Sequence, residues 1–131
     1  GVRKYGWCCN CPKCQFVFLA LSPFIPREKL ISIFGKNMLA DETQEDGFRE
    51  LCGLKGHKPF ECVGEIEECQ MIMKTLTTTE WANDVLVKKL STELDIDAKN
   101  ADALERSALS FKYDHNIPAA FLEHLNAFIR P

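Results

Sequence analysis

The sequence lacks a long hydrophobic run, and it lacks an excess of positive charge. Its longest unbroken apolar stretch, residues 16–21, has six residues, whereas a helix needs about 20 to span a bilayer. The 131 residues carry 16 basic and 19 acidic side chains, a net charge of -3, and the isoelectric point is about 5.6. Such a chain has no strong field to hold a polyphosphate backbone. These absences exclude a membrane-spanning protein and argue against nucleic-acid binding.

The common nucleotide-binding and hydrolytic motifs are also missing. The sequence has no phosphate-binding glycine loop that ends in Lys-Ser or Lys-Thr, no dinucleotide-binding Gly-x-Gly-x-x-Gly, no His-Glu-x-x-His and no Gly-x-Ser-x-Gly. We therefore expect that this chain alone cannot bind ATP by any of these routes.

Hydrophobic residues make up 46% of the chain, which is enough to close one core of ordinary density. They recur at helical spacing, and no alternating strand pattern appears. We expect one mainly α domain over residues 1–131, a compact unit of six or seven helices with a cysteine knuckle at its N-terminus. The sequence begins with Gly1 rather than Met and has no apolar signal-peptide stretch. We expect it to be a piece of a longer protein.

The first predicted helix opens with Pro12 and is apolar nearly all round, so we expect it to be central, with Phe16, Phe18 and Leu19 buried. A second helix should follow Pro26 and end at a left-handed Gly35. Further helices are expected at about residues 43–52, 65–76, 101–109 and 118–129, and another from a Thr79 cap through Trp81 to Leu90. In the helix at 43–52, Thr43 and Asp46 stand at capping-box spacing.

Seven cysteines are an odd count, and four of them crowd into the segment CCNCPKC. Cys8, Cys11 and Cys14 are each separated by two residues, a spacing that lets thiolates converge on one zinc ion. Cys62, His57 or a residue upstream of Gly1 could supply the fourth ligand. The alternative is that these cysteines are small buried hydrophobes. Either use favours free thiols over a framework of disulfides, and free thiols favour a reducing cytoplasm.

Residues 53–64 form the least regular stretch, with three glycines and a proline in twelve residues. A connection of about this length is often functional. Together with Glu65, its His57, Lys58, Glu61 and Cys62 offer anion binding and proton transfer. The alternative is an ordinary connection between two helices, in which Glu65 simply begins the next helix.

Two blocks of the sequence carry a resemblance to a known family. CPKCQFVFLALSPFIPREKLISIFGKNML and GFRELCGLKGHKPFECVGEIEE resemble the C-terminal part of the ATP-dependent UDP-N-acetylmuramoyl-L-alanyl-L-glutamate epimerases of bacterial peptidoglycan synthesis. The resemblance covers residues 7–76 well and continues more loosely toward the end. A remoter similarity is to PP-loop ATP pyrophosphatases, whose zinc knuckle has the same three cysteines after an earlier one that has no counterpart here.

The resemblance implies an enzyme whose N-terminal, nucleotide-handling part is missing from this chain. ATP, with Mg²⁺, would be cleaved to AMP and pyrophosphate while the terminal L-glutamate of a UDP-linked muramoyl dipeptide becomes D-glutamate. In this interpretation Cys62 and Glu61 are the candidate proton-transfer residues, Lys58, His57 and Glu65 are candidate substrate-binding residues, and the fragment alone is inactive. Two alternatives remain: the zinc-bearing tail of another PP-loop ATP pyrophosphatase, and a non-enzymatic, zinc-stabilised interaction module.

Overall fold

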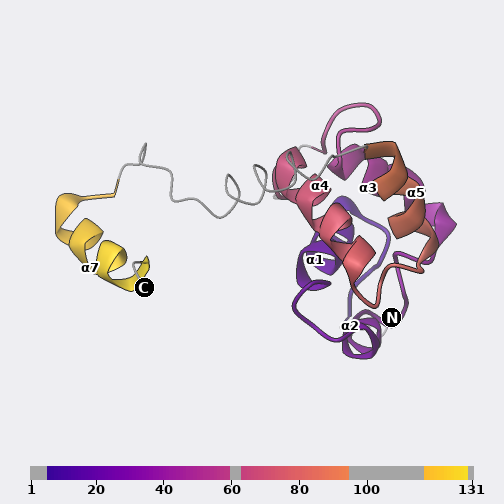
Figure 1. The fold of residues 1–131 in the computed structure, drawn as a ribbon, viewed down its shortest axis with the longest axis horizontal. Helices are drawn as coiled ribbons and strands as arrows, with labels where there is room; N and C mark the ends of the chain where they lie inside the picture. The colour runs from indigo at the N-terminus through magenta and orange to yellow at the C-terminus, as the bar shows by residue number, and fades with distance from the viewer. Residues whose placement is uncertain (1–5, 60–62, 95–116, 130–131) are drawn as a thin grey trace, which may run out of the picture.

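A computed structural model describes residues 6–59, 63–94 and 117–129 of the chain. Within these ranges it contains six α-helices, two short 3₁₀ helices and no strand (Figure 1). The predicted mainly α fold is therefore confirmed. The predicted helix at 101–109 and the candidate residues Glu61 and Cys62 lie outside the described residues.

Helix α1 (Pro12–Leu21) is the centre of the fold, as predicted. Cys11 is its N-cap and Pro12 its first residue, where the missing amide of proline costs nothing. Phe18 and Leu19 are fully buried, and α1 contacts α2, α3 and α4. Phe16 is only half-buried and packs at the edge of the core.

Helix α2 (Arg27–Phe34) folds back on α1 as the second arm of a helical hairpin. Pro26 occupies the N-cap position, one residue before the helix. At the other end Gly35 adopts a left-handed φ of 83° and donates its amide to the carbonyl of Ile31, as the sequence predicts. Leu30 and Phe34 point into the core.

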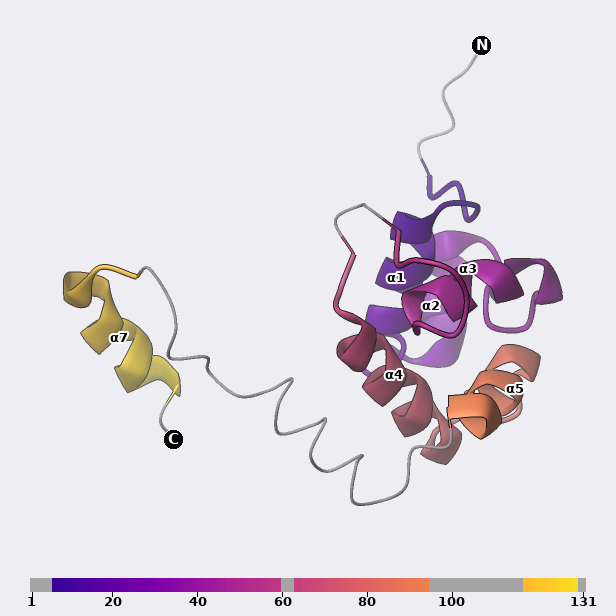
Figure 2. The same cartoon turned by 90° about the horizontal axis from the view of Figure 1, so that it is seen from above.

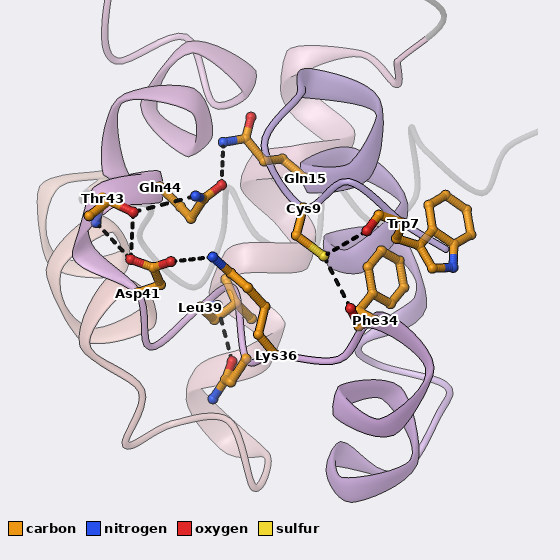
Figure 3. Close-up of polar contacts among 10 residues, drawn as sticks. Trp7, Cys9, Gln15, Phe34, Lys36, Leu39, Asp41, Thr43 and Gln44 are labelled. Atoms are coloured by element: carbon orange, nitrogen blue, oxygen red, sulfur yellow. Dashed lines mark hydrogen bonds and ion pairs between the residues drawn. The ribbon is translucent and has the colours of Figure 1, made fainter. Parts of the chain in front are cut away.

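A 3₁₀ turn, η1 (Glu42–Gln44), leads into α3 (Glu45–Leu51). The predicted capping box of Thr43 and Asp46 is wrong, because Asp41 caps this segment by accepting a hydrogen bond from the Thr43 amide at 3.0 Å. Gln44 is buried and accepts a hydrogen bond from Gln15 of α1 at 3.0 Å (Figure 3). Helix α1 and the turn η1 therefore meet at this buried pair of glutamine side chains.

Helix α4 (Ile66–Thr75) begins at a capping box, in which the amide of Glu65 donates to the carboxylate of Glu68 at 3.0 Å. It continues as the 3₁₀ turn η2 (Leu76–Thr78). The helical spacing of Ile66, Cys69, Met73 and Leu76 predicts that these side chains face inward. Cys69, Met73 and Leu76 are fully buried, whereas Ile66, in the first turn, is only half-buried.

Helix α5 (Val85–Leu94) begins later than predicted. Thr79 does accept a hydrogen bond from the amide of Trp81, at 3.3 Å, but residues 79–84 form turns rather than a helix. Trp81 is buried in these turns, and its indole donates to the carbonyl of Ser22 at 2.9 Å. This long-range bond fastens the chain before α5 to the α1–α2 hairpin.

Helix α7 (Ala119–Ile129) lies apart from the group formed by α1 to α5 in both views (Figures 1 and 2). Its helical prediction is confirmed, and Phe121 and Phe128 are 65% and 90% exposed. None of the described helices is long and apolar enough to cross a membrane. That residues 1–131 form one domain stays a prediction.

Candidate functional site

The three regularly spaced cysteines converge, as their spacing predicts. The sulfur of Cys8 lies 3.3 Å from that of Cys11 and 3.4 Å from that of Cys14, and all three sulfurs lie within 4.8 Å of one another. Cys8 is exposed, Cys11 half-buried and Cys14 buried. The cluster therefore sits at the surface end of α1, with one side toward the core and one toward solvent.

Cys9, the fourth thiol of the segment, points away from the cluster. Its backbone φ is 51°, an uncommon left-handed conformation for a residue other than glycine. Its buried sulfur donates to the carbonyl of Phe34 at 3.2 Å, and the ring of Trp7 stacks on the ring of Phe34 at 4.6 Å (Figure 3). The turn at Cys9 thus directs Cys8 toward the cluster and fixes the segment to the end of α2.

The thiols of the cluster differ in acidity. Hydrogen bonding lowers the pKa of Cys8; the backbone of Asn10 contributes most, and the bonds with the Cys11 and Cys14 side chains come next. Burial, assisted by the hydrogen bond with Cys8, raises the pKa of Cys14 to about 11. Metal ions bind thiolates and displace their protons, so this set can hold a soft metal ion once its protons leave.

The loop of residues 53–64, called the polar loop below, and Glu65 directly after it carry five candidate residues, of which His57, Lys58 and Glu65 are described. Lys58 and Glu65 form an ion pair, with 3.2 Å between the lysine nitrogen and a carboxylate oxygen. The lysine side chain is 25% exposed and the glutamate side chain 69% exposed. His57 is exposed. Lys58 and Glu65 lie on either side of Glu61 and Cys62 in the sequence.

Both ends of the loop are attached to the helices. At the first end, the side chain of Gln70 donates to the carbonyl of Cys52 at 2.9 Å. At the second, Gly64 lies so close to Phe16 that a Cβ atom on the glycine would come within 2.4 Å of the ring. Phe16 follows Cys14 by two positions on α1. The second end of the loop therefore lies against the first half of the helix that carries the cysteine cluster.

The contacts of Cys9 and Trp7 were not predicted from the sequence. Their partner, Phe34, is 25 residues from Cys9, and no local spacing connects them. The only signal was the aromatic residue placed directly before the cysteine pair.

Fold and site together define a small helical domain with a three-thiol cluster at one end of its central helix and a polar loop beside that helix. The MurL C-terminal domain family matches residues 2–105. The chain belongs to this family, which confirms the resemblance found in the sequence. The match includes α1 to α5, whereas α7 lies beyond it.

Curated relatives carry the same name throughout, "UDP-N-acetyl-alpha-D-muramoyl-L-alanyl-L-glutamate epimerase". The chain is 44% identical over 124 residues to the epimerase of a Micromonospora species, and the match covers 91% of this chain and 27% of the relative. It is 41% identical over 124 residues to that of Xanthomonas oryzae pv. oryzae, with 94% and 28% covered. For Salinispora tropica the identity is 48% over 105 residues, with 79% and 22% covered. The chain thus spans about a quarter of the length of these relatives. No solved structure matches it.

Proposed function

We propose that this chain is the C-terminal domain of an ATP-dependent epimerase that converts the terminal L-glutamate of UDP-MurNAc-L-Ala-L-Glu to D-glutamate for peptidoglycan synthesis. The observation that carries the proposal is the 41–48% identity to three epimerases across most of this chain. The same matches favour it over the tail of a different ATP pyrophosphatase and over a non-enzymatic module.

The proposed reaction begins with activation of the substrate. An oxygen of the glutamate α-carboxylate attacks the α-phosphorus of ATP, and pyrophosphate leaves, so that an acyl adenylate forms. Loss of the carboxylate charge acidifies the α C–H, and a base of modest strength can then remove this proton. An acid on the opposite face returns a proton, and water hydrolyses the acyl adenylate to the carboxylate and AMP.

The two activities fall to different parts of the protein in this proposal. This chain has no phosphate-binding glycine loop, so we assign ATP and Mg²⁺ to the rest of the protein, upstream of this domain. Six of the cysteines are unpaired thiols, which fits a reducing compartment, and we place the reaction in the cytoplasm.

The polar loop supplies the proposed contribution of this domain to proton exchange. Cys62 and Glu61 take part in proton transfer at the α-carbon, and a thiol suits this work because its ordinary pKa of about 8.5 can be lowered by a nearby cation. Lys58, with His57, binds an anionic group of the substrate. Glu65 is a positioning residue, because its carboxylate holds the Lys58 nitrogen at 3.2 Å.

The test follows solvent deuterium into the glutamate α-position of UDP-MurNAc-L-Ala-L-Glu in the presence of ATP. We expect ATP-dependent exchange by the full-length protein and none by residues 1–131 alone. Cys62→Ser and Glu61→Gln should each slow exchange by about 10²–10⁴-fold, the usual contribution of a general acid or base. Absence of exchange in the wild type would refute the epimerase function. Wild-type rates in both variants would instead remove only these residues from the mechanism.

Lysine variants separate binding from proton transfer. Lys58→Met should raise KM more than it lowers kcat, because the lysine binds an anionic group of the substrate in this proposal. Lys55→Met is the matched control, since Lys55 lies in the same loop and pairs with Asp46 on the surface. Equal KM values in the two variants would contradict the role of Lys58.

A further inference from the structure

We propose that Cys8, Cys11 and Cys14 bind one zinc ion that fastens the segment before α1 to the rest of the domain. The three sulfurs surround a single point, since each lies within 4.8 Å of the other two. Zinc–thiolate bonds of about 2.3 Å directed to the corners of a tetrahedron place the sulfurs about 3.8 Å apart. The separations of 3.3 Å and 3.4 Å from Cys8 are close to this value, so a small adjustment suffices to admit the ion.

The backbone around the cluster already has the form of a ligand loop. Cys11 is the N-cap of α1, and its sulfur accepts a hydrogen bond from the amide of Cys14 at 3.5 Å. Amides at a helix N-terminus stabilise negative charge on such a sulfur. Cys9 has a left-handed φ of 51°, and the sulfur of Cys8, directly before it, lies beside those of the other two cysteines. Strain of this kind persists where the surrounding structure requires it, as around a bound ligand.

The donor set favours zinc over other metals. Three thiolates are soft ligands, which select zinc rather than Mg²⁺ or Ca²⁺. In an iron–sulfur cluster the thiolates bind different irons and therefore spread apart, whereas these sulfurs converge. In the described part of the chain no carboxylate or imidazole joins the three thiols to form a larger group. We therefore assign the fourth position to a water molecule, as in zinc sites that have three protein ligands.

The proposed zinc ion would cross-link the segment before α1, through Cys8 and Cys11, to α1 itself, through Cys14. The same segment is attached to the last residue of α2 through the Cys9 thiol and the stacked ring of Trp7. Zinc would thereby hold the start of α1 and the end of α2 together, a role that stands independently of the epimerase reaction.

Elemental analysis of the full-length protein, purified without a metal-affinity tag, tests this proposal. We expect one zinc per chain, and we expect that Cys8→Ser, Cys11→Ser and Cys14→Ser each lose most of it. Cys9→Ser is the matched control: it removes a thiol from the same segment, but one that points away from the cluster, and it should retain the zinc. Replacement by cobalt should give sulfur-to-cobalt charge-transfer absorption that falls in each of the three ligand variants and is unchanged in the control.

A second measurement, on the wild-type protein, tests the proposal even if the cysteine variants fail to fold. A strong chelator added to the wild-type protein should lower its thermal midpoint, and an equimolar return of zinc should restore it. Wild-type protein without zinc, or zinc retained when all three cysteines are replaced together, would overturn the proposal. Visible absorption from bound iron and sulfide in place of zinc would overturn it as well.

Discussion

Replacement of Phe18 by alanine tests whether α1 is the centre of the core. The side chain of Phe18 is fully buried, and its ring makes edge contacts with Phe34 at 5.0 Å and with Trp81 at 5.6 Å between ring centres. A buried phenylalanine cut back to alanine costs about 3–5 kcal/mol, and edge contacts between aromatic rings contribute about 0.5–1.5 kcal/mol each. We expect Phe18→Ala to fall in the upper half of the first range, because both ring contacts are lost.

The measurement is the free energy of unfolding from urea or guanidinium titrations, with equal slopes required for comparison. Phe24→Ala provides the matched control, since Phe24 lies in the turn between α1 and α2 and is 82% exposed. Its loss should change stability by less than about 0.5 kcal/mol. A cost below about 1 kcal/mol for Phe18→Ala would mean that α1 is not buried in the protein, and the argument for a central helix would fail.

Two further predictions concern α3 and the turn before it. Gly47→Ala should destabilise by about 1 kcal/mol, because its new Cβ would lie 2.2 Å from the amide group of Gln15 and displace a buried hydrogen bond, which outweighs the gain in helix propensity. In a Gln15→Ala background the same change should become stabilising, as a double-mutant cycle of denaturant titrations would reveal. For Asp41, hydrogen bonds from Lys36 and from a neighbouring threonine lower the pKa to about 2. Since this folded-state pKa lies below the unfolded value, the stabilisation is complete above about pH 4 and is lost as the pH falls toward 2. Asp41→Asn should reduce the loss of stability over that interval, and an unchanged pH profile would contradict the assignment.

Local signals in the sequence predicted the elements that depend on neighbouring residues. Pro12 marks the start of α1 because its fixed φ suits the first position of a helix. Gly35 ends α2 because glycine readily adopts a left-handed φ. The cysteine cluster could be predicted for the same reason, since Cys8, Cys11 and Cys14 are three residues apart. The sequence does not single out Asp41 as the cap, because several side chains near position 43 can cap a helix and spacing alone does not choose among them.

Long-range contacts account for the remaining errors. The helical spacing of Trp81, Val85 and Leu90 predicts a helix that includes Trp81. This residue lies instead in a turn that brings its indole to the carbonyl of Ser22, 59 residues away. Tertiary packing determines this geometry.

Burial makes Cys52 and Cys69 chemically different from the exposed thiol of Cys8. Both side chains are fully enclosed, and burial raises the pKa of each to about 12. At neutral pH only about one such thiol in 10⁵ is ionised. Oxidants and alkylating reagents attack thiolates, so these two residues behave as inert apolar side chains. Among the described cysteines, Cys8 is the exposed one, so thiol reagents and oxidants in solution reach the N-terminal cluster at that residue.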